Sequence, residues 1–337
     1  MSDCPIYSSF SSEVEWIKEI HRRETLDFPL AVRSLAEFYL KKRLIILNDG
    51  PIRIDPRLGR PLPYLASWFA DAFGLNNDKI RNKFALTLSY AALIVSIRDD
   101  LLDSKVSTAN AHICLANMYS TKYFMTFESI LPSRSEFWYI FSNCLNKWAE
   151  YESWHFIFRY DAHINPLSRH FLKRASSYLV DITLPTLSAI AIITNNKNKI
   201  HTITKFLRDY YMGFRIVDDI RDWREDLKVR SFNHSSILYY VSKKIKSRRR
   251  LTTEAVMSVF SNGNCIKEIY DSIKTFYIAA RDDIISFNSS SLEKFIDTQI
   301  SLQEDERNNF NHRMSEFYNR LNDLLVLPKI NLAAEYI

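Results

Sequence analysis

Glycine is scarce, since the chain of 337 residues contains only five. β-Sandwiches, β-barrels and dinucleotide-binding folds use glycine at tight turns, bulges and phosphate-binding loops. So few glycines cannot supply those positions in a protein of this length. The alternation of apolar and polar residues that marks β-strands is also absent. The sequence therefore predicts an all-α protein.

Long apolar runs and paired cysteines are missing as well. No stretch reaches the ~20 apolar residues that a membrane span needs. The opening segment, MSDCPIYSSFSSEVEWIKEI, lacks the features of a secretory signal. The four cysteines, Cys4, Cys114, Cys144 and Cys265, show no CxxC spacing, which argues for a reducing compartment and against a zinc site. We therefore expect a cytoplasmic protein.

Apolar residues instead recur at helical spacing along most of the chain. Helices are predicted over 11–23, 28–46, 61–74, 78–104, 107–131, 135–160, 166–194, 199–228, 235–247, 251–261, 264–289 and 293–326. No internal repeat or long linker divides them. We therefore predict one domain over residues 1–337, built as a bundle of about ten or more helices.

The net charge of +6 is concentrated in one basic run over residues 243–250. Such a run is most often a solvated loop, although it also suits a nucleic-acid or membrane surface. Two clusters of carboxylates elsewhere in the chain make nucleic acid a poor candidate, so we expect no nucleic-acid partner.

The first carboxylate cluster, Asp99-Asp100-Leu101-Leu102-Asp103, ends an apolar helix. Asp99 and Asp103 are spaced i, i+4 and share one helix face, where like charges repel and the helix dipole disfavours anions. A bound divalent cation removes both objections. Because all-oxygen ligands select hard ions, the cluster predicts a site for Mg²⁺ or Mn²⁺.

A second cluster, Asp218-Asp219-Ile220-Arg221-Asp222, follows another apolar helix and continues to Asp226. Asp218, Asp222 and Asp226 recur at i, i+4 and i+8 on one face. Either cluster alone fits a solvated charged turn, but two of them, each closing an apolar helix, favour a shared metal site. On this basis Asp99→Ala and Asp219→Ala are expected to abolish activity with little loss of stability.

The segments IRDDLLD (97–103) and GFRIVDDIRDW (213–223) resemble the aspartate-rich motifs of the trans-isoprenyl diphosphate synthase and class I terpene synthase superfamily. A weaker similarity covers RLGRPLPYLASWFADAFG (57–74), and the whole resemblance spans roughly residues 50–240. It implies the class I isoprenoid synthase fold, with a central apolar cavity below two facing motif helices. The superfamily also makes a homodimer the default expectation.

The resemblance implies roles for particular residues. The residues predicted to hold the metal ions that bind the diphosphate of an allylic prenyl substrate are Asp99, Asp100, Asp103, Asp218, Asp219 and Asp222. The residues predicted to bind that substrate are Arg60, Arg174, Arg215, Asp226 and Lys228. Trp148 and Tyr151 begin an aromatic run, some rings of which suit a cavity wall, although core packing is the commoner role for any single ring.

Within the superfamily, elongating enzymes hold isopentenyl diphosphate with a cluster of cations, and few are found here. Only Arg57 and Arg60 remain in the first segment, only Lys105 is near the first motif, and Ile182-Thr183 stands where a Lys-Thr pair is expected. Fewer cations favour an enzyme with one diphosphate, so we expect a Mg²⁺-dependent terpene cyclase. The all-carboxylate second motif is instead similar to that of elongating enzymes. A prenyltransferase, with isopentenyl diphosphate or another acceptor, is therefore the alternative.

Overall fold

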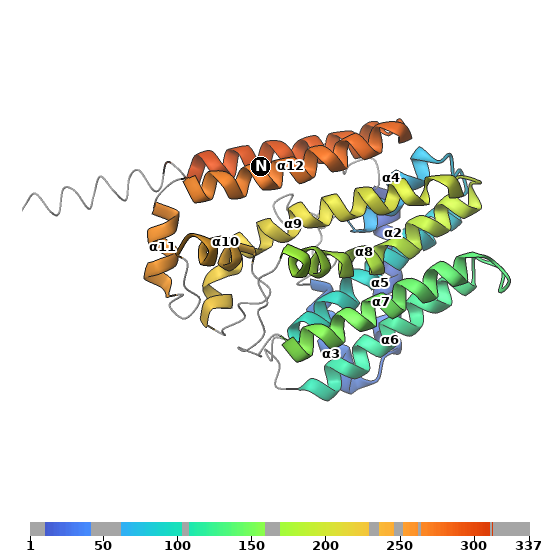
Figure 1. The fold of residues 1–337 in the computed structure, drawn as a ribbon. Helices are drawn as coiled ribbons and strands as arrows, with labels where there is room; N and C mark the ends of the chain where they lie inside the picture. Colours follow the sequence, from blue (N-terminus) through green and yellow to red (C-terminus); the bar gives the residue numbers. More distant parts are fainter. Residues whose placement is uncertain are drawn as a thin grey trace, which may run out of the picture.

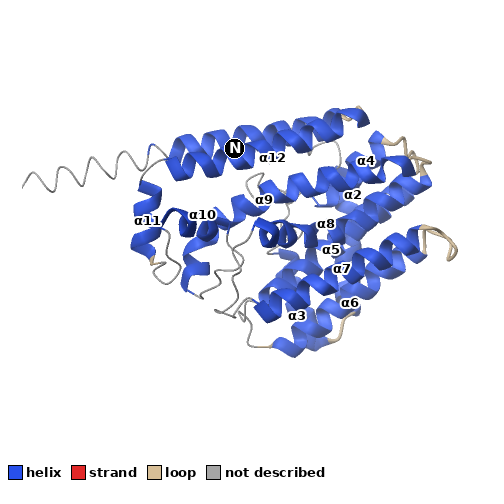
Figure 2. Cartoon of the chain, in the orientation of Figure 1, coloured by secondary structure: helices blue, strands red, loops and turns tan. Residues whose placement is uncertain are grey.

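The computed structural model describes residues 11–41, 62–102, 108–158, 169–228, 236–245, 252–261, 264–310 and 312. Throughout these ranges the chain is helical with short connections and contains no strand, which confirms the predicted all-α class (Figures 1 and 2). The helices of the first half are α2 (Ser11–Asp27), α3 (Leu30–Tyr39), α4 (Leu62–Ala72), α5 (Asp78–Leu102), α6 (Ala109–Glu128) and α7 (Phe137–Phe158).

The second half follows the same pattern. Its helices are α8 (Arg169–Ile193), α9 (Ile200–Lys228), α10 (Ser236–Ile245), α11 (Thr253–Ser261) and α12 (Asn264–Ile284), with 3₁₀ turns at Lys197–Lys199 and Ile285–Phe287 and a further helix over 290–310. None of the described helices combines the length and the apolar character that crossing a membrane requires.

The observed helix ends lie close to the predicted ones. The helix predicted to end at Gly74 ends at Ala72, and Gly74 adopts a φ of 71°, a left-handed conformation that glycine takes without strain. Asn288, with a φ of 50°, separates α12 and its 3₁₀ turn from the helix over 290–310. The segments predicted as helical over 42–46 and 313–326 lie outside the described residues.

The two helices that carry the aspartate motifs are the inner helices of the bundle. α9 packs against α12 on one side and α8 on the other, and α8 also contacts α5 and α7 (Figure 1). Nearly every residue of α5 from Phe84 to Ile97 is buried, and a helix that is apolar all round belongs in the core. Both motifs therefore lie where a buried helix reaches the end of the bundle.

Gly213, the glycine of the second motif segment, allows α9 and α12 to approach closely. A Cβ atom at this position would lie 2.7 Å from Cε1 of Tyr277 on α12. The Tyr277 ring is 1% exposed and stacks on Tyr210 at a ring-centroid distance of 5.9 Å. Because the ring is packed on all sides, it has little room to move away from an added methyl group.

We expect Gly213→Ala to lower the free energy of unfolding by about 1–3 kcal/mol, because it overpacks the α9–α12 contact. In an unobstructed helix the same change would raise stability by about 1 kcal/mol, so the sign of the effect is diagnostic. Urea unfolding of Gly213→Ala, Tyr277→Leu and the double variant measures this change in the free energy of unfolding. In the Tyr277→Leu background the cost of the alanine should shrink, and an equal cost in both backgrounds would show that the ring is not the obstacle.

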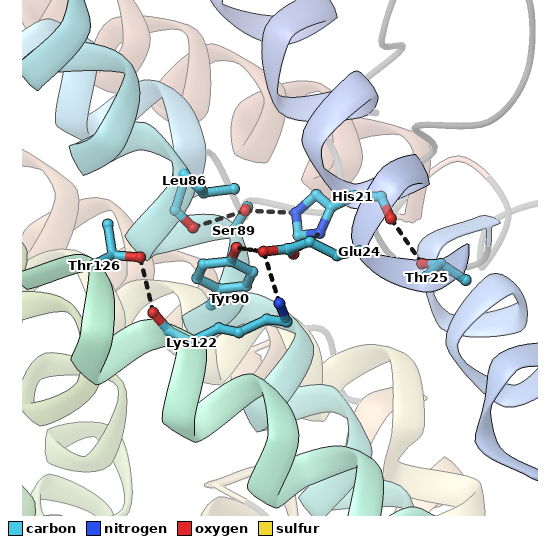
Figure 3. A network of polar contacts seen from close by, with 8 residues as sticks. All are labelled: His21, Glu24, Thr25, Leu86, Ser89, Tyr90, Lys122 and Thr126. Carbon is cyan, nitrogen blue, oxygen red and sulfur yellow. Dashed lines mark hydrogen bonds and ion pairs between the residues drawn. The ribbon is translucent and has the colours of Figure 1, made fainter. Parts of the chain in front are cut away.

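A buried polar network fastens α2 to α5 and α6 (Figure 3). His21 on α2 is fully buried, and its Nε2 lies 2.8 Å from the Ser89 hydroxyl on α5, which itself donates to the Leu86 carbonyl. The Glu24 carboxylate accepts hydrogen bonds from the Tyr90 hydroxyl at 2.6 Å and the Lys122 ammonium at 3.0 Å. Burial, aided by the positive charge of Lys122, lowers the pKa of His21 to about 3.

This network predicts loss of stability in acid. Because His21 stays neutral in the folded chain down to about pH 3, only the unfolded chain binds a proton as the pH falls below ~6.5. The free energy of unfolding should then decrease between about pH 6.5 and 3, by up to about 1.4 kcal/mol per pH unit from this group. Urea unfolding at several pH values measures the slope.

The His21→Gln variant keeps an N–H donor for Ser89 but cannot titrate, so its slope should be shallower than that of the wild type. His201→Gln, at an exposed position, is the matched control and should keep the wild-type slope. Equal slopes for all three proteins would mean that His21 already binds its proton in the folded chain.

Candidate active site

The second aspartate motif presents its carboxylates on one side of α9. By helical spacing this side carries Arg215, Asp218, Asp219, Asp222 and Asp226. Asp219 is buried at 2% exposure, Asp218 and Asp226 are half-buried, and Asp222 is exposed. The motif therefore passes from the core to solvent along this side of the helix.

Arg215 compensates the charge of Asp219. Its Nε lies 3.0 Å from Oδ1 of Asp219, one helical turn away. Burial acts to lower the pKa of Arg215, but the negative charges of Asp219 and Asp218 outweigh it and raise that pKa well above its ordinary value. The expectation that Asp219 is an uncompensated charge, removable at little cost, is therefore wrong, because its removal would leave a guanidinium largely buried without its partner.

The neighbouring residues Asp99 and Asp100 of the first motif point in different directions. Asp99 is half-buried and lines a cavity between α5, α7, α8 and α9. Asp100 is 6% exposed, and its Oδ2 accepts a hydrogen bond from the hydroxyl of Tyr39 on α3 at 2.8 Å. Adjacent residues of a helix face directions about 100° apart, so only one of this pair faces the cavity.

The cavity joins the two motif helices. It has a volume of about 20 Å³ and is lined by Val95, Arg98, Asp99, Leu102, Trp148, Tyr151, Glu152, Tyr178 and Arg215. It thus brings an aspartate of the first motif and the arginine of the second motif segment to one site, although they are far apart in the sequence. Its small volume means that the lining side chains must separate before a ligand enters.

Charged and aromatic groups form the walls of this cavity. Arg98 forms an ion pair with Glu152 and lies over the Trp148 ring, 4.6 Å from its centroid. Burial raises the pKa of Glu152, and the charge of Arg98 opposes that shift. Tyr151 and Tyr178 stack with ring centroids 4.9 Å apart and planes inclined by 8°. Trp148 and Tyr151 therefore line the cavity, and Arg98 covers one face of the Trp148 ring.

The other predicted substrate-binding residues differ in where they lie. Asp226 shares the motif side of α9, and Lys228 is exposed at the end of that helix. Arg174 belongs to α8, but its side chain is outside the described part of the chain, as are Arg60 and Asp103 altogether. Of the two predicted cations whose side chains the structure describes, Arg215 and Lys228, Arg215 lines the cavity.

Sequence reasoning missed Arg98, Glu152 and Tyr178. Arg98 directly precedes the first motif, and Glu152 follows Trp148 at i+4, which is the signal that could have identified both. Ile182, compared above with a lysine of the elongating enzymes, is buried, and the Tyr123 hydroxyl donates to its carbonyl at 2.9 Å. Among the α8 side chains that the structure describes, Tyr178, one turn earlier, lines the cavity.

A larger groove, of about 640 Å³, lies on the opposite side of the α9 C-terminal turns. Ile220, Trp223 and Arg224 line it from α9, together with Phe260 of α11 and Phe310 of the helix over 290–310. None of the motif aspartates within the described ranges lines this groove. Although large apolar pockets are the usual default for a site, Asp99 and Arg215 lie at the smaller cavity.

The fold matches solved structures, although no protein-family model and no curated protein matches the sequence. A polyprenyl synthase from Caulobacter crescentus CB15, solved with calcium and isoprenyl diphosphate, matches with a TM-score of 0.61 at 12% identity, over 86% of this chain and 97% of that one. A geranylgeranyl pyrophosphate synthase from Lactobacillus brevis ATCC 367 matches with a TM-score of 0.64 at 12% identity, over 88% and 97%. The chain has the trans-isoprenyl diphosphate synthase fold.

T. brucei FPPS is a third match, with a TM-score of 0.55 at 11% identity, over 87% of this chain and 98% of that one. At identities this low, the structural matches establish only the architecture, which is that of an isoprenyl diphosphate synthase. The chemistry of this chain has to be argued from its own residues.

The motif residues of this isoprenyl diphosphate synthase fold suit a hard divalent cation by their chemistry. Asp99, Asp218 and Asp222 offer only carboxylate oxygens, the ligands that Mg²⁺ and Mn²⁺ prefer. Among the described residues no three acidic, histidine or cysteine side chains converge closely enough to hold a metal ion together. Mg²⁺ commonly uses one or two carboxylates and completes its ligands with substrate phosphate oxygens.

Because Asp219 forms an ion pair with Arg215, replacing Asp219 should affect stability differently from replacing Asp222 of the same motif. We expect Asp219→Ala to lower the free energy of unfolding by about 3–5 kcal/mol, since it leaves Arg215 largely buried without its partner. Asp222→Ala, at an exposed position, should cost about 1 kcal/mol or less. Urea unfolding without metal measures both, and the pair replacement Asp219→Leu with Arg215→Met should recover most of the loss. Equal costs for the two alanine variants would contradict the assignment.

Proposed function

We propose that this chain is a divalent-metal-dependent prenyltransferase that ionises an allylic prenyl diphosphate and transfers the prenyl group to an acceptor. The observation that carries the proposal is the cavity in which Asp99 of the first motif meets Arg215 of the second motif segment. Carboxylates for a metal and a guanidinium for a phosphate are the two groups that diphosphate recognition requires.

Three observations favour prenyl transfer over the cyclase that the cation count suggested. The solved structures that share the fold are named as polyprenyl, geranylgeranyl pyrophosphate and FPP synthases. The second motif carries carboxylates at Asp218, Asp222 and Asp226, as the elongating enzymes of the superfamily do. The cavity also contains two arginines, Arg98 and Arg215, so cations are less scarce at the site than the sequence indicated.

The residues of the chain perform three tasks in this reaction. Asp99, Asp218 and Asp222 would hold the divalent cation, which when bound supplies Lewis acidity toward the departing diphosphate. Arg215 and Arg98 offer positive charge to the phosphate oxygens. The stacked rings of Tyr151 and Tyr178 and the side chains of Val95 and Leu102 exclude water from the reacting carbon.

The bond changes are balanced without any oxidant or reductant. The bond between C1 of the prenyl group and the diphosphate oxygen breaks, and its electron pair leaves with the diphosphate. An electron pair of the acceptor forms the new bond to C1, and the acceptor then loses a proton. The aromatic walls stabilise the developing positive charge on the prenyl chain by about 0.5–2 kcal/mol per ring.

A direct test is incubation with ten-, fifteen- and twenty-carbon allylic diphosphates, with and without isopentenyl diphosphate. We expect product only when an acceptor is present, no turnover after EDTA treatment, and recovery of turnover with Mg²⁺ or Mn²⁺. Asp99→Asn should lower kcat/KM by at least about 100-fold, because it removes a metal ligand. Mass spectrometry of the products measures each of these effects.

The matched control is Asp282→Asn, which changes an exposed aspartate of α12 far from both motifs and should leave turnover unchanged. Turnover that survives complete metal removal would sink the proposal. A cyclic or hydroxylated hydrocarbon formed from the allylic substrate alone would instead identify a terpene cyclase. The observation that favours this second candidate is that, among the α8 residues whose side chains the structure describes (177–193), Tyr178 lines the cavity and no cation does.

A further inference from the structure

The first aspartate motif has a partner on a helix outside the two motif segments. Tyr39 is the last residue of α3, is fully buried, and donates its hydroxyl proton to Oδ2 of Asp100 at 2.8 Å. The two residues are 61 positions apart in the sequence, so only the packing of α3 against α5 and α6 brings them together.

The environment of Asp100 makes its carboxylate depend on this hydrogen bond. Asp100 is 6% exposed and lies in the last turn of α5, where the helix dipole disfavours a negative charge. A buried carboxylate there requires strong donors, and hydrogen bonds to charged groups are about twice as strong as neutral ones. The Tyr39 hydroxyl supplies such a donor from outside the helix.

The Tyr39 ring is itself held in position. His112 on α6 contacts it edge to face, with ring centroids 5.8 Å apart and planes inclined by 87°. His112 is 5% exposed, and its Nδ1 lies 2.8 Å from the Thr108 carbonyl oxygen. A series of contacts therefore runs from His112 on α6 through Tyr39 on α3 to the carboxylate of Asp100.

We propose that Tyr39 is a positioning residue for the metal site, a role that rests on the proposed function. By fixing Asp100, Tyr39 sets the rotation of the last turn of α5. The neighbouring Asp99 is thereby turned toward the cavity that contains Arg215. Tyr39 does not line that cavity and acts only through Asp100. Removing the Tyr39 hydroxyl should therefore weaken metal binding while the fold is retained.

The test measures binding of Mn²⁺ in the presence of inorganic diphosphate, by electron paramagnetic resonance. We expect Tyr39→Phe to weaken Mn²⁺ binding about 10-fold or more, the usual effect of removing an outer partner of a metal ligand. Far-UV circular dichroism should remain that of the wild type. In turnover assays, the Mg²⁺ concentration at half-maximal rate should rise by a similar factor, while kcat at saturating Mg²⁺ should fall less.

Tyr123→Phe is the matched control. It also removes a hydroxyl from a buried tyrosine, one that donates to the Ile182 carbonyl at 2.9 Å, and it should leave Mn²⁺ binding unchanged. If Tyr39→Phe and Tyr123→Phe weaken Mn²⁺ binding equally, or neither does, the positioning role is overturned while the proposed function stands. If the wild type with diphosphate binds no Mn²⁺, the proposed function itself fails.

A second variant tests the route through Asp100. Asp100→Ala removes the carboxylate that accepts from the Tyr39 hydroxyl. If Tyr39 acts through Asp100, adding Tyr39→Phe to Asp100→Ala should weaken Mn²⁺ binding by much less than the 10-fold change expected in the wild type. Multiplicative effects of the two changes would overturn the mechanism.

Discussion

The structure depends on the compensation of carboxylates that are buried at the ends of apolar helices. α5 and α9 are inner helices of the bundle, and each carries its aspartates where the core meets solvent. Burying such a charge is costly unless a partner is close. Asp219 has Arg215 at 3.0 Å, and Asp100 has the Tyr39 hydroxyl at 2.8 Å. These two contacts allow one acidic residue of each motif to be buried while its neighbours remain accessible.

This compensation divides each motif into residues with different tasks. In the first motif Asp99 faces the cavity and Asp100 faces α3. In the second, Asp219 is held by Arg215, whereas Asp222 is exposed to solvent. The carboxylates of an aspartate-rich motif are therefore not equivalent, because some are buried against a partner and others face the cavity or solvent. The same principle applies at the middle of α5, where the half-buried Glu24 accepts hydrogen bonds from Tyr90 and Lys122 (Figure 3).

The residues that line the cavity show why the number of cations at the site could not be predicted from the sequence alone. Arg98 and Arg215 both reach the cavity, and each is paired with a carboxylate, Glu152 or Asp219. Under the proposed function, an incoming diphosphate would compete with those carboxylates for the guanidinium groups. The affinity for diphosphate would then reflect the difference between arginine–diphosphate and arginine–carboxylate contacts. This difference depends on the packing of α5, α7 and α9.

The sequence by itself determined the all-α class, the approximate ends of the helices and the two aspartate motifs. It could do so because helical periodicity, scarce glycine and i, i+4 spacing are local properties of the chain. Which aspartate faces the cavity, the pairing of Arg98 with Glu152, the stack of Tyr151 on Tyr178 and the contact of Tyr39 with Asp100 were decided only by the tertiary structure. The physical reason is that these contacts join residues from different helices, and the rotation and crossing of helices follow from how their side chains pack.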